Sequence, residues 1–464
     1  MASDCHPTLP SNAVRPLLSR RLLLSTLLLS ALPRLAWFAT HGPILSPDSF
    51  GYLNLARDLR GLGPSHTWDD KAFLPADNQA ARTPGYPLFL NLVFALAGHS
   101  PSPDEAIRRA AQQHVPPAPR HLQHLATDEN VRAVQAAQVV LGILSTGFVY
   151  ATVFLWTGSA AASAAGALIA VGWNPIWIVM FEPTLLTEVP SASLMIVTMW
   201  LVARNTGTAR DDVTISLLCG FAVLLRPATI FAVVPVVTFL VWTHGRDRRA
   251  IRTVGPAAAI VLSLIGFNGV RYGHWGISST TGANLFSHTV NHPEALRDPI
   301  RSQAIQYKGN VSAGLAIERD LVGPQTSYLE AERIVGAAAV RFIADHPVLY
   351  LQSVAAAIAE FWSPTIRLFP YQINIVRTQA RWLWFVIVGV EALLTLLGAA
   401  ALLMRIAPAA RLGTAVFVVS SVGMALAAHT ENRRYAMPVE PLLFMSATTV
   451  ATQLVRRRSS REPA

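Results

Sequence analysis

Residues 132–156 read RAVQAAQVVLGILSTGFVYATVFLW, a long segment whose only charged residue is Arg132. About 20 apolar residues are enough to cross the hydrocarbon core of a membrane as a helix. Comparable segments recur from Leu22 to Leu454, so the sequence predicts an all-α fold, a polytopic membrane protein with about ten transmembrane helices. The predicted spans lie near residues 20–39, 132–156, 160–180, 185–203, 213–225, 228–243, 253–271, 382–404, 412–428 and 438–455.

The composition of the whole chain excludes a water-soluble globular protein. Of its 464 residues, 52% are hydrophobic and 14% are charged, whereas soluble domains carry about 25% charged residues. The net charge of +10 comes almost entirely from arginine. Many arginines flank apolar segments, which indicates a membrane topology signal and not a nucleic-acid partner. Cys5 lies in a polar tail and Cys219 in an apolar span, so we expect no disulfide.

Arginines also indicate the side of the membrane on which each span ends. With ten spans the arginine-rich segments all fall on one side, which the positive-inside rule assigns to the cytoplasm. Residues 1–464 then form one membrane domain with cytoplasmic tails at 1–19 and 456–464. The long polar connections 40–131 and 272–381 become outer loops, so any chemistry is expected on the outer face. The arginines on the cytoplasmic side include Arg20, Arg21, Arg204, Arg210, Arg249, Arg252, Arg405, Arg411 and Arg456.

Two segments of the outer loops have the residue spacing of amphipathic helices. The first begins near Tyr52, and the second follows a capping box at Ser327 and stops before His346. We expect both to lie on the membrane surface with the apolar side down. Residues 348–362 are interpreted as interfacial, and residues 100–129 as a flexible insertion. The apolar stripes are Tyr52, Leu55, Ala56, Leu59 and Leu62 in the first helix and Ala331, Ile334, Val335, Ala338 and Phe342 in the second.

Acidic side chains on the outer face are the first candidates for a functional site. Asp48 precedes the first surface helix, where capping of that helix and a functional role are equally reasonable. Tyr52, four residues later, continues the same stripe. Glu182 and Glu188 flank the outer end of the fourth span. Burial of Glu188 without a partner would cost several kcal/mol, so we expect a partner or a polar cavity.

Arginines on the same face are the second set of candidates. Arg226 lies between two short apolar stretches and precedes Pro227, an irregularity tolerated beside a protein cavity, although the side chain could also snorkel to lipid headgroups. Arg433 and Arg434 lie in a short outer loop, where positive charge is disfavoured. We interpret them as phosphate ligands or as headgroup contacts. Arg82 opens a turn before another apolar run and is either a ligand or solvated.

Several well-known site motifs are absent from the sequence. It contains no Gly-rich phosphate loop, no HExxH and no GxSxG. The cytoplasmic loops contain no Asp-x-Asp pair of the kind that binds a metal with a nucleotide sugar. We therefore assign no residue to a metal, name no certain cofactor and expect no nucleotide-linked donor.

Five motifs, in order along the chain, resemble those of the GT-C superfamily of membrane glycosyltransferases. The chain is most similar to the bacterial branch related to protein O-mannosyltransferases and lipid A aminoarabinose transferases. The similarity extends over residues 17–275 and returns more weakly at 327–455. The motifs are SPDSFGYLNLAR from Ser46, TPGYPLFL from Thr83, LLTE ending at Glu188, LLRP ending at Pro227 and RRYAMP from Arg433.

The resemblance implies a reaction and roles for particular residues. In that family a sugar moves from a polyprenyl-phosphate carrier to an acceptor on the outer face, here a lipid, a glycan or a protein. Asp48 would be the catalytic base, and Arg82, Arg226, Arg433 and Arg434 would lie near the donor phosphate. One base in a single displacement predicts inversion at the anomeric carbon. The resemblance also implies the bacterial inner membrane as location and a lipid-linked sugar as co-substrate.

Two other classes of membrane protein remain as alternatives. A carrier or flippase for a lipid-linked or anionic substrate would place polar groups near the bilayer midplane and often has inverted repeats. Here the notable charges gather at the outer ends and no repeat is visible, although Arg34 and Arg226 would suit a carrier. A membrane acyltransferase would need a His-centred motif, for which His429 is the nearest candidate.

Overall fold

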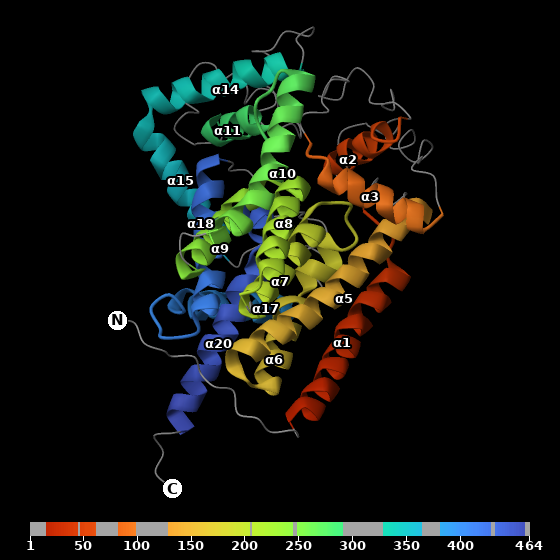
Figure 1. Cartoon of the computed structure of the whole chain (residues 1–464), viewed down its shortest axis with the longest axis vertical. Coiled ribbons are helices and arrows are strands. Elements are labelled where there is room, and N and C mark those ends of the chain that lie inside the picture. The colour runs from red at the N-terminus through yellow and green to blue at the C-terminus, as the bar shows by residue number, and fades with distance from the viewer. Residues whose placement is uncertain are drawn as a thin grey trace.

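The computed structural model describes most of the chain as a helical bundle (Figure 1). Within the described residues, the β-structure is limited to an isolated bridge between Ile44 and Thr184. The predicted all-α class is confirmed. The predictions for Leu62, Ser327, His429 and residues 100–128 lie outside the described residues. These are 15–44, 47–61, 82–98, 129–204, 207–244, 248–290, 328–363, 381–427 and 432–459.

Each predicted span coincides with helical structure, with ends shifted by a few residues. Among the described residues, five helical segments are long and apolar enough to cross a membrane by these criteria alone. The remaining predicted spans are shorter or more polar. In chain order the spans are α1 (Arg15–Thr40), α5 (Glu129–Thr157), α6 (Ala160–Ala167) with the π-helices η3 (Leu168–Gly172) and η4 (Ile176–Phe181), α7 (Glu188–Arg204), α8 (Ala209–Leu225), the 3-10 helix η5 (Pro227–Thr229) with α9 (Ile230–His244), α10 (Arg248–Tyr272), α17 (Arg381–Ala400), α18 (Pro408–Ala427) and α20 (Glu440–Ser459).

The helices α1 and α7 illustrate the two environments of the bundle. On α1, which packs against α5, Leu24, Leu28, Leu32 and Leu35 lie three or four residues apart and are 54–69% exposed. A continuous exposed apolar face on a long helix is what contact with lipid requires. By contrast, α7 is buried along most of its length between α5 and α8. Other helices, and not lipid, therefore surround most of α7, which is also one of the shorter spans.

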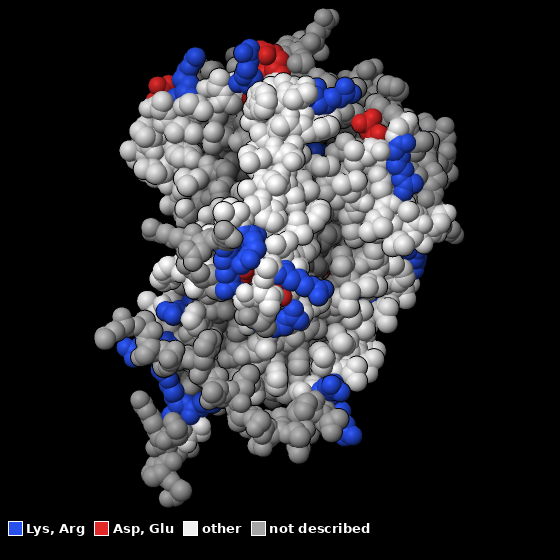
Figure 2. All heavy atoms as spheres, viewed as in Figure 1, with Lys and Arg blue, Asp and Glu red and all other residues white. Residues whose placement is uncertain are grey.

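The outer-loop helices gather at one end of the bundle. In Figure 1, α2 (Pro47–Asp58), α3 (Gly85–Leu96), α11 (Thr281–Val290), α14 (Tyr328–Asp345) and α15 (Pro347–Trp362) lie toward the upper end. The last turn of α20, with Arg456, lies at the lower end. Figure 2 shows charged side chains toward both ends of α10, with uncharged surface between them. This arrangement agrees with the predicted topology, and the side of the membrane to which each end belongs stays a prediction.

The apolar stripe of α2 faces protein, so the expectation that this side points down to the membrane is wrong, and the position of the helix at the membrane surface stays a prediction. Tyr52, Leu55 and Ala56 are buried, whereas Leu59 is exposed. An amphipathic stripe does not distinguish lipid from protein, and here the neighbouring segments supply an apolar protein surface. The helix also begins at Pro47, so that Asp48 lies inside its first turn and not ahead of it. The partners of this stripe include Tyr86, Leu90, Phe94, Leu185 and Leu186.

The helices α14 and α15 meet at a sharp bend. As predicted, α14 stops before His346, and the two helices are bent by 106°. The end of α15 rests on α18, where the rings of Phe361 and Phe417 lie 5.0 Å apart. Nε1 of Trp362 also donates to Oγ of Ser421 at 3.1 Å. Residues 348–362 are therefore anchored to the bundle, and their interfacial position stays a prediction.

Candidate functional site

Five charged side chains from five separate segments form one continuous set of ion pairs. They come from the first turn of α2, the turn before α3, the first turn of α7, the junction of α8 with η5, and the short helix α19 (Asn432–Ala436). We call this set the charged network. Its members in order of contact are Arg82, Asp48, Arg434, Glu188 and Arg226.

Asp48 is the carboxylate of the charged network that water can reach. Its Oδ1 accepts a hydrogen bond from Nη2 of Arg82 at 2.6 Å, and its Oδ2 lies 2.7 Å from Nη2 of Arg434. The side chain is 25% exposed. Burial would raise the pKa of Asp48, but the two guanidinium groups outweigh it and hold that pKa below its ordinary value. The carboxylate is therefore ionised at neutral pH.

Glu188 is the fully buried carboxylate of the charged network. Its Oε1 lies 2.7 Å from Nη1 of Arg226 and also accepts a hydrogen bond from Nε of Arg434. The side chain is 0% exposed. Burial of a carboxylate without a partner would be costly, and here two guanidinium groups are its partners. Glu188 thus fixes the relative position of the two arginines.

Aromatic rings support the two outermost arginines. The guanidinium carbon of Arg82 lies 5.1 Å from the centre of the Tyr52 ring, and that of Arg226 lies 4.7 Å from the centre of the Tyr435 ring. Tyr52 in turn meets Tyr86 edge to face, with ring centres 5.0 Å apart. Such cation–π contacts hold the plane of a guanidinium group in place. The orientation of the arginines is therefore set before any ligand arrives.

The charged network is unbalanced in charge and in hydrogen bonding. Three guanidinium groups face two carboxylates, which leaves a surplus of one positive charge. In addition, Nε of Arg82 and Nε of Arg226 are buried and have no hydrogen-bond partner among the residues that the structure describes. Buried donors of this kind are uncommon in folded proteins. A surplus of cationic donors is the electrostatic requirement for binding an anion.

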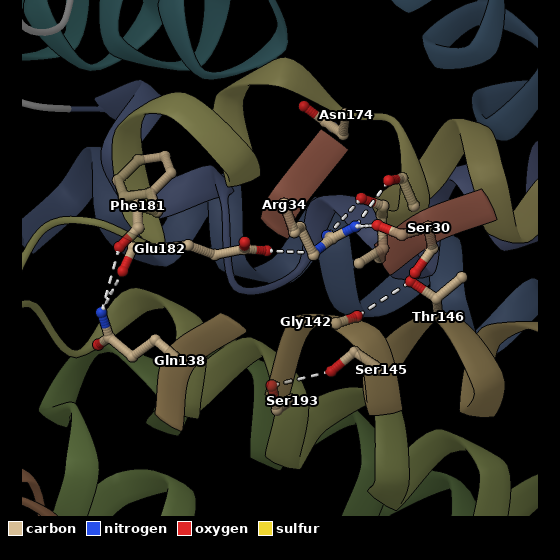
Figure 3. Close-up of polar contacts among 12 residues, drawn as sticks. Ser30, Arg34, Gln138, Gly142, Ser145, Thr146, Asn174, Phe181, Glu182 and Ser193 are labelled. Atoms are coloured by element: carbon tan, nitrogen blue, oxygen red, sulfur yellow. Dashed lines mark hydrogen bonds and ion pairs between the residues drawn. The ribbon is translucent and has the colours of Figure 1, made fainter. Parts of the chain in front are cut away.

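Six of the eight residues singled out from the sequence meet here, namely Asp48, Tyr52, Arg82, Glu188, Arg226 and Arg434. Glu182 does not join them, because its Oε1 accepts a hydrogen bond from Nε of Arg34 at 2.8 Å in a separate buried pair (Figure 3). The backbone of Arg433 belongs to α19, and its side chain lies outside the described part of the structure. The roles of all eight residues stay predictions.

Four further residues at or near the network were not identified from the sequence. Thr187 accepts a hydrogen bond from Nη1 of Arg226 at 3.0 Å. Tyr86 and Tyr435 lie inside the conspicuous motifs, so their proximity to the charged residues was available as a signal. Gln138 had no such signal, because a single amide in an apolar span is commonly a helix–helix contact.

The described residues contain no group of three or more His, Cys, Asp or Glu side chains that could hold a metal ion. The charged network accordingly offers two carboxylates, each already paired with arginine. Its chemistry is that of anion binding by guanidinium groups, beside a carboxylate that is able to accept a proton.

Comparison with known proteins confirms the resemblance to glycosyltransferases for part of the chain. The model of the family described as dolichyl-phosphate-mannose-protein mannosyltransferase matches residues 114–272. This range includes Glu188 and Arg226 of the charged network. No curated protein matches the chain significantly.

Two solved structures are distantly similar to the chain. The crystal structure of ArnT from Cupriavidus metallidurans bound to undecaprenyl phosphate is 14% identical, covers 97% of this chain and 79% of that chain, and has a TM-score of 0.34. The structure of the same protein in the apo state is 13% identical, covers 94% and 78%, and has a TM-score of 0.32.

Proposed function

We propose that the protein is a membrane glycosyltransferase that moves a sugar from a polyprenyl-phosphate carrier to an acceptor hydroxyl. The observation that carries the proposal is the charged network, in which three arginines surround an accessible carboxylate with a surplus of one positive charge. A sugar linked to a lipid through one phosphate is a phosphodiester with one negative charge. The match of residues 114–272 to a mannosyltransferase family supports the same class of reaction.

The donor phosphate would enter the charged network at Asp48. Of the two carboxylates, Glu188 is 0% exposed and Asp48 is 25% exposed, so Asp48 is the one that an incoming anion is able to displace. A phosphate between Arg82 and Arg434 would satisfy the donors that now meet Asp48. Glu188 would keep Arg226 and Arg434 in place throughout, because its contacts are entirely internal.

Displacement by phosphate would also prepare Asp48 for its chemical role. Once freed from two guanidinium groups, the carboxylate becomes more basic and able to take the proton of the acceptor hydroxyl. The acceptor oxygen then bonds to the anomeric carbon while the bond from that carbon to the phosphate oxygen breaks. The lipid phosphate leaves with a second negative charge, which Arg82, Arg226 and Arg434 stabilise. A single displacement of this kind inverts the configuration at the anomeric carbon.

The location of the site fits a reaction on the outer face of a bacterial inner membrane. The charged network lies at the end of the bundle that holds α2 and α3, opposite the arginines that close α20. Under the positive-inside rule the arginine-rich end is cytoplasmic. The acceptor, whether lipid, glycan or protein, would then approach from outside.

The carrier alternative receives less support from the geometry. Arg34, the charged residue within the first span, donates hydrogen bonds to Glu182 and to three backbone carbonyl groups. Its guanidinium group is therefore occupied by internal partners and not free for a transported anion. Arg226 is held by Glu188 and Thr187 at one end of the bundle.

The test is a donor panel with the purified protein in lipid nanodiscs. Short-chain polyprenyl phosphates carrying mannose, glucose or aminoarabinose are supplied with membrane lipid, glycan and peptide acceptors, and the release of free lipid phosphate is measured. We expect release with at least one donor and inverted configuration in the product. Tight binding of the donors without release, across all acceptors, would overturn the enzyme in favour of a carrier.

A further inference from the structure

Arg34 and Glu182 form a buried ion pair beside the broken span formed by α6, η3 and η4, which we call the inner ion pair (Figure 3). Nη1 of Arg34 donates to the carbonyl oxygen atoms of Gly172 at 2.6 Å and Ser30 at 3.0 Å, and Nη2 donates to that of Val171 at 2.8 Å. The bonds to Val171 and Gly172 satisfy carbonyl groups where the π-helix η3 ends, and the bond to Ser30 stays within α1. The inner ion pair therefore joins α1, the helix break and the residues after η4 into one unit.

The helix α5 approaches this unit at a glycine. A side-chain carbon on Gly142 would lie 2.8 Å from Nε of Arg34 and would also collide with the carboxylate of Glu182. One turn earlier, α5 places Gln138 against the backbone of the same segment, as Figure 3 shows. The position of Gln138 is therefore set by the close contact of α5 with the inner ion pair.

Gln138 joins this unit to the charged network through an amide with a defined orientation. Its Nε2 donates to the carbonyl oxygen atoms of Glu182 at 2.8 Å and Thr184 at 2.9 Å. Carbonyl groups only accept, so the nitrogen must face them. The amide oxygen then accepts the hydrogen bond from the hydroxyl group of Tyr86 at 3.2 Å. The side chain is fully buried, so no water replaces these contacts.

The connection held by Gln138, residues 182–187, also holds the segment that carries Asp48. The amide of Ile44 donates to Pro183 at 2.7 Å, and the amide of Leu185 donates back to Ile44 at 3.1 Å. Oγ of Ser49, the neighbour of Asp48, donates to the carbonyl group of Leu185 at 2.8 Å. Displacement of this connection would therefore shift the start of α2.

The contact of Gln138 with Tyr86 leads to the carboxylate of Asp48 by a second route. Tyr86 packs edge to face on Tyr52, whose ring lies under Arg82, and Arg82 donates to Asp48. In contrast, Glu188, Arg226 and Arg434 hold one another directly through short ion pairs. The contacts of Gln138 therefore reach Asp48 by two routes, whereas the arginine end of the charged network is also held by its own ion pairs.

We propose that Gln138, supported by the inner ion pair, is a positioning residue that aligns Asp48 with the arginine end of the charged network. The proposal rests on the proposed transferase function. Catalytic groups act only within narrow limits of position, and a displacement of about 1 Å costs up to 10²-fold in rate. Loss of Gln138 therefore slows turnover more than it weakens donor binding, because Arg434, one of the two arginines proposed to hold the phosphate, keeps its own ion pair with Glu188.

The experiment compares Gln138→Met, which keeps the length of the side chain, with Tyr86→Phe and with the control Gln135→Met. Gln135 lies one turn from Gln138 on α5, is also buried and, among the described residues, donates to the carbonyl group of His41 at 3.3 Å. Turnover is measured with the donor that the unaltered protein uses fastest in the panel above. Rates are divided by the number of sites that bind short-chain polyprenyl phosphate, so that unfolded protein does not count as slow enzyme.

We expect Gln138→Met to lower kcat about tenfold to hundredfold with KM for the donor changed less than about threefold. Tyr86→Phe removes one neutral hydrogen bond and should lower kcat about twofold to tenfold, and Gln135→Met should retain normal kcat. Normal kcat in Gln138→Met, or an equal loss in Gln135→Met, would overturn the positioning role. If Gln138→Met does not fold, normal kcat in Tyr86→Phe overturns it instead. If the unaltered protein releases no lipid phosphate, the proposed transferase function is wrong, and the positioning role of Gln138 is wrong as well.

Discussion

The charged network and the inner ion pair are both buried sets of arginine and carboxylate, yet they differ in balance. In the inner ion pair one arginine meets one glutamate, and backbone carbonyl groups take the remaining hydrogen bonds of Arg34. In the charged network the cations are in excess and Asp48 is reached by water, whereas both sets contain a buried polar atom without a hydrogen-bond partner among the described residues. Burial of an ion pair therefore does not distinguish the two sets. Unequal charge beside an accessible carboxylate does, and it is the reason for proposing the charged network as the site.

The largest effect is expected from Asp48→Asn, which removes the proton acceptor from the charged network. Asparagine keeps the shape of the side chain and still suits the start of a helix. Transfer should fall about 10²–10⁴-fold, the usual contribution of a general base. Binding of polyprenyl phosphate should be retained or become tighter, because the competing carboxylate is neutralised. Release of lipid phosphate and equilibrium binding measure the two effects, and a normal rate of transfer would leave Asp48 a structural partner of the two arginines and not a base.

The inner ion pair should reveal itself through stability and not through chemistry. Arg34→Met leaves Glu182 buried without its partner, which typically costs about 3–5 kcal/mol. The double replacement with Glu182→Met should be less destabilising than the single one, since no buried charge remains. Thermal unfolding in detergent measures both, with Arg82→Met as a comparison in a pair that is about a quarter exposed. Equal stability of Arg34→Met and the unaltered protein would contradict the structural role of the pair.

An intermediate effect is expected when an arginine of the charged network is replaced by lysine. Arg226→Lys and Arg434→Lys keep the charge but lose the planar fork that bridges Glu188 to a phosphate. Loss of a charged hydrogen bond costs about 1.5–3 kcal/mol, a tenfold to hundredfold effect expected in both donor affinity and turnover. Arg333→Lys, at an exposed pair with Glu330 on α14, is the matched control. Unchanged binding and turnover in both variants would remove the phosphate assignment.

The smallest effect concerns the pH dependence of the unaltered protein. Arg82 and Arg434 lower the pKa of Asp48 in the free protein against the effect of burial, so Asp48 stays ionised when the pH falls to the ordinary range of carboxyl groups. The profile of kcat/KM, which reports the free enzyme, should therefore show no acid limb from Asp48 there. The profile of kcat should show an acid limb, and as the pH is lowered kcat should begin to fall at a higher pH than kcat/KM does. The reason is that bound phosphate releases Asp48 from the arginines and so raises its pKa. Coincident acid limbs would argue against that exchange.

The predicted topology places Asp48, Glu188 and Arg226 at the outer ends of their segments, and the structure joins these three residues in the charged network. The sequence did not predict their pairing. Glu182 and Glu188 are six residues apart and have similar surroundings in the sequence, yet each meets a different arginine. The choice depends on the path of the connection between them, which hydrogen bonds to Ile44 and Gln138 determine. Contacts between segments distant in sequence leave no local pattern.

The same limit explains the error at α2. The period of its apolar residues correctly predicted a helix and its buried face. The nature of the opposing surface depends on where α3 and the residues before α7 lie, and that is set by the fold as a whole. Arg34 carried a more useful signal, since a charge within an apolar span implies an internal partner. Its partner, Glu182, was grouped in the sequence with the candidate site residues, whereas in the structure it belongs to the inner ion pair and not to the charged network.

The position of Arg434 has a consequence for how the chain is made. This arginine alone contacts both carboxylates of the charged network, and it is the last of the five residues to be synthesised. Roughly 200 residues separate it from Arg226, and at about 5–20 residues per second the ribosome needs about 10–40 s to cover them. During that interval Glu188 can already pair with Arg226, while half of the contacts of Asp48 do not yet exist. The nascent protein thus passes through a stage in which the segments up to Arg226 exist and the charged network still lacks Arg434, and the synthesis of α19 completes that network.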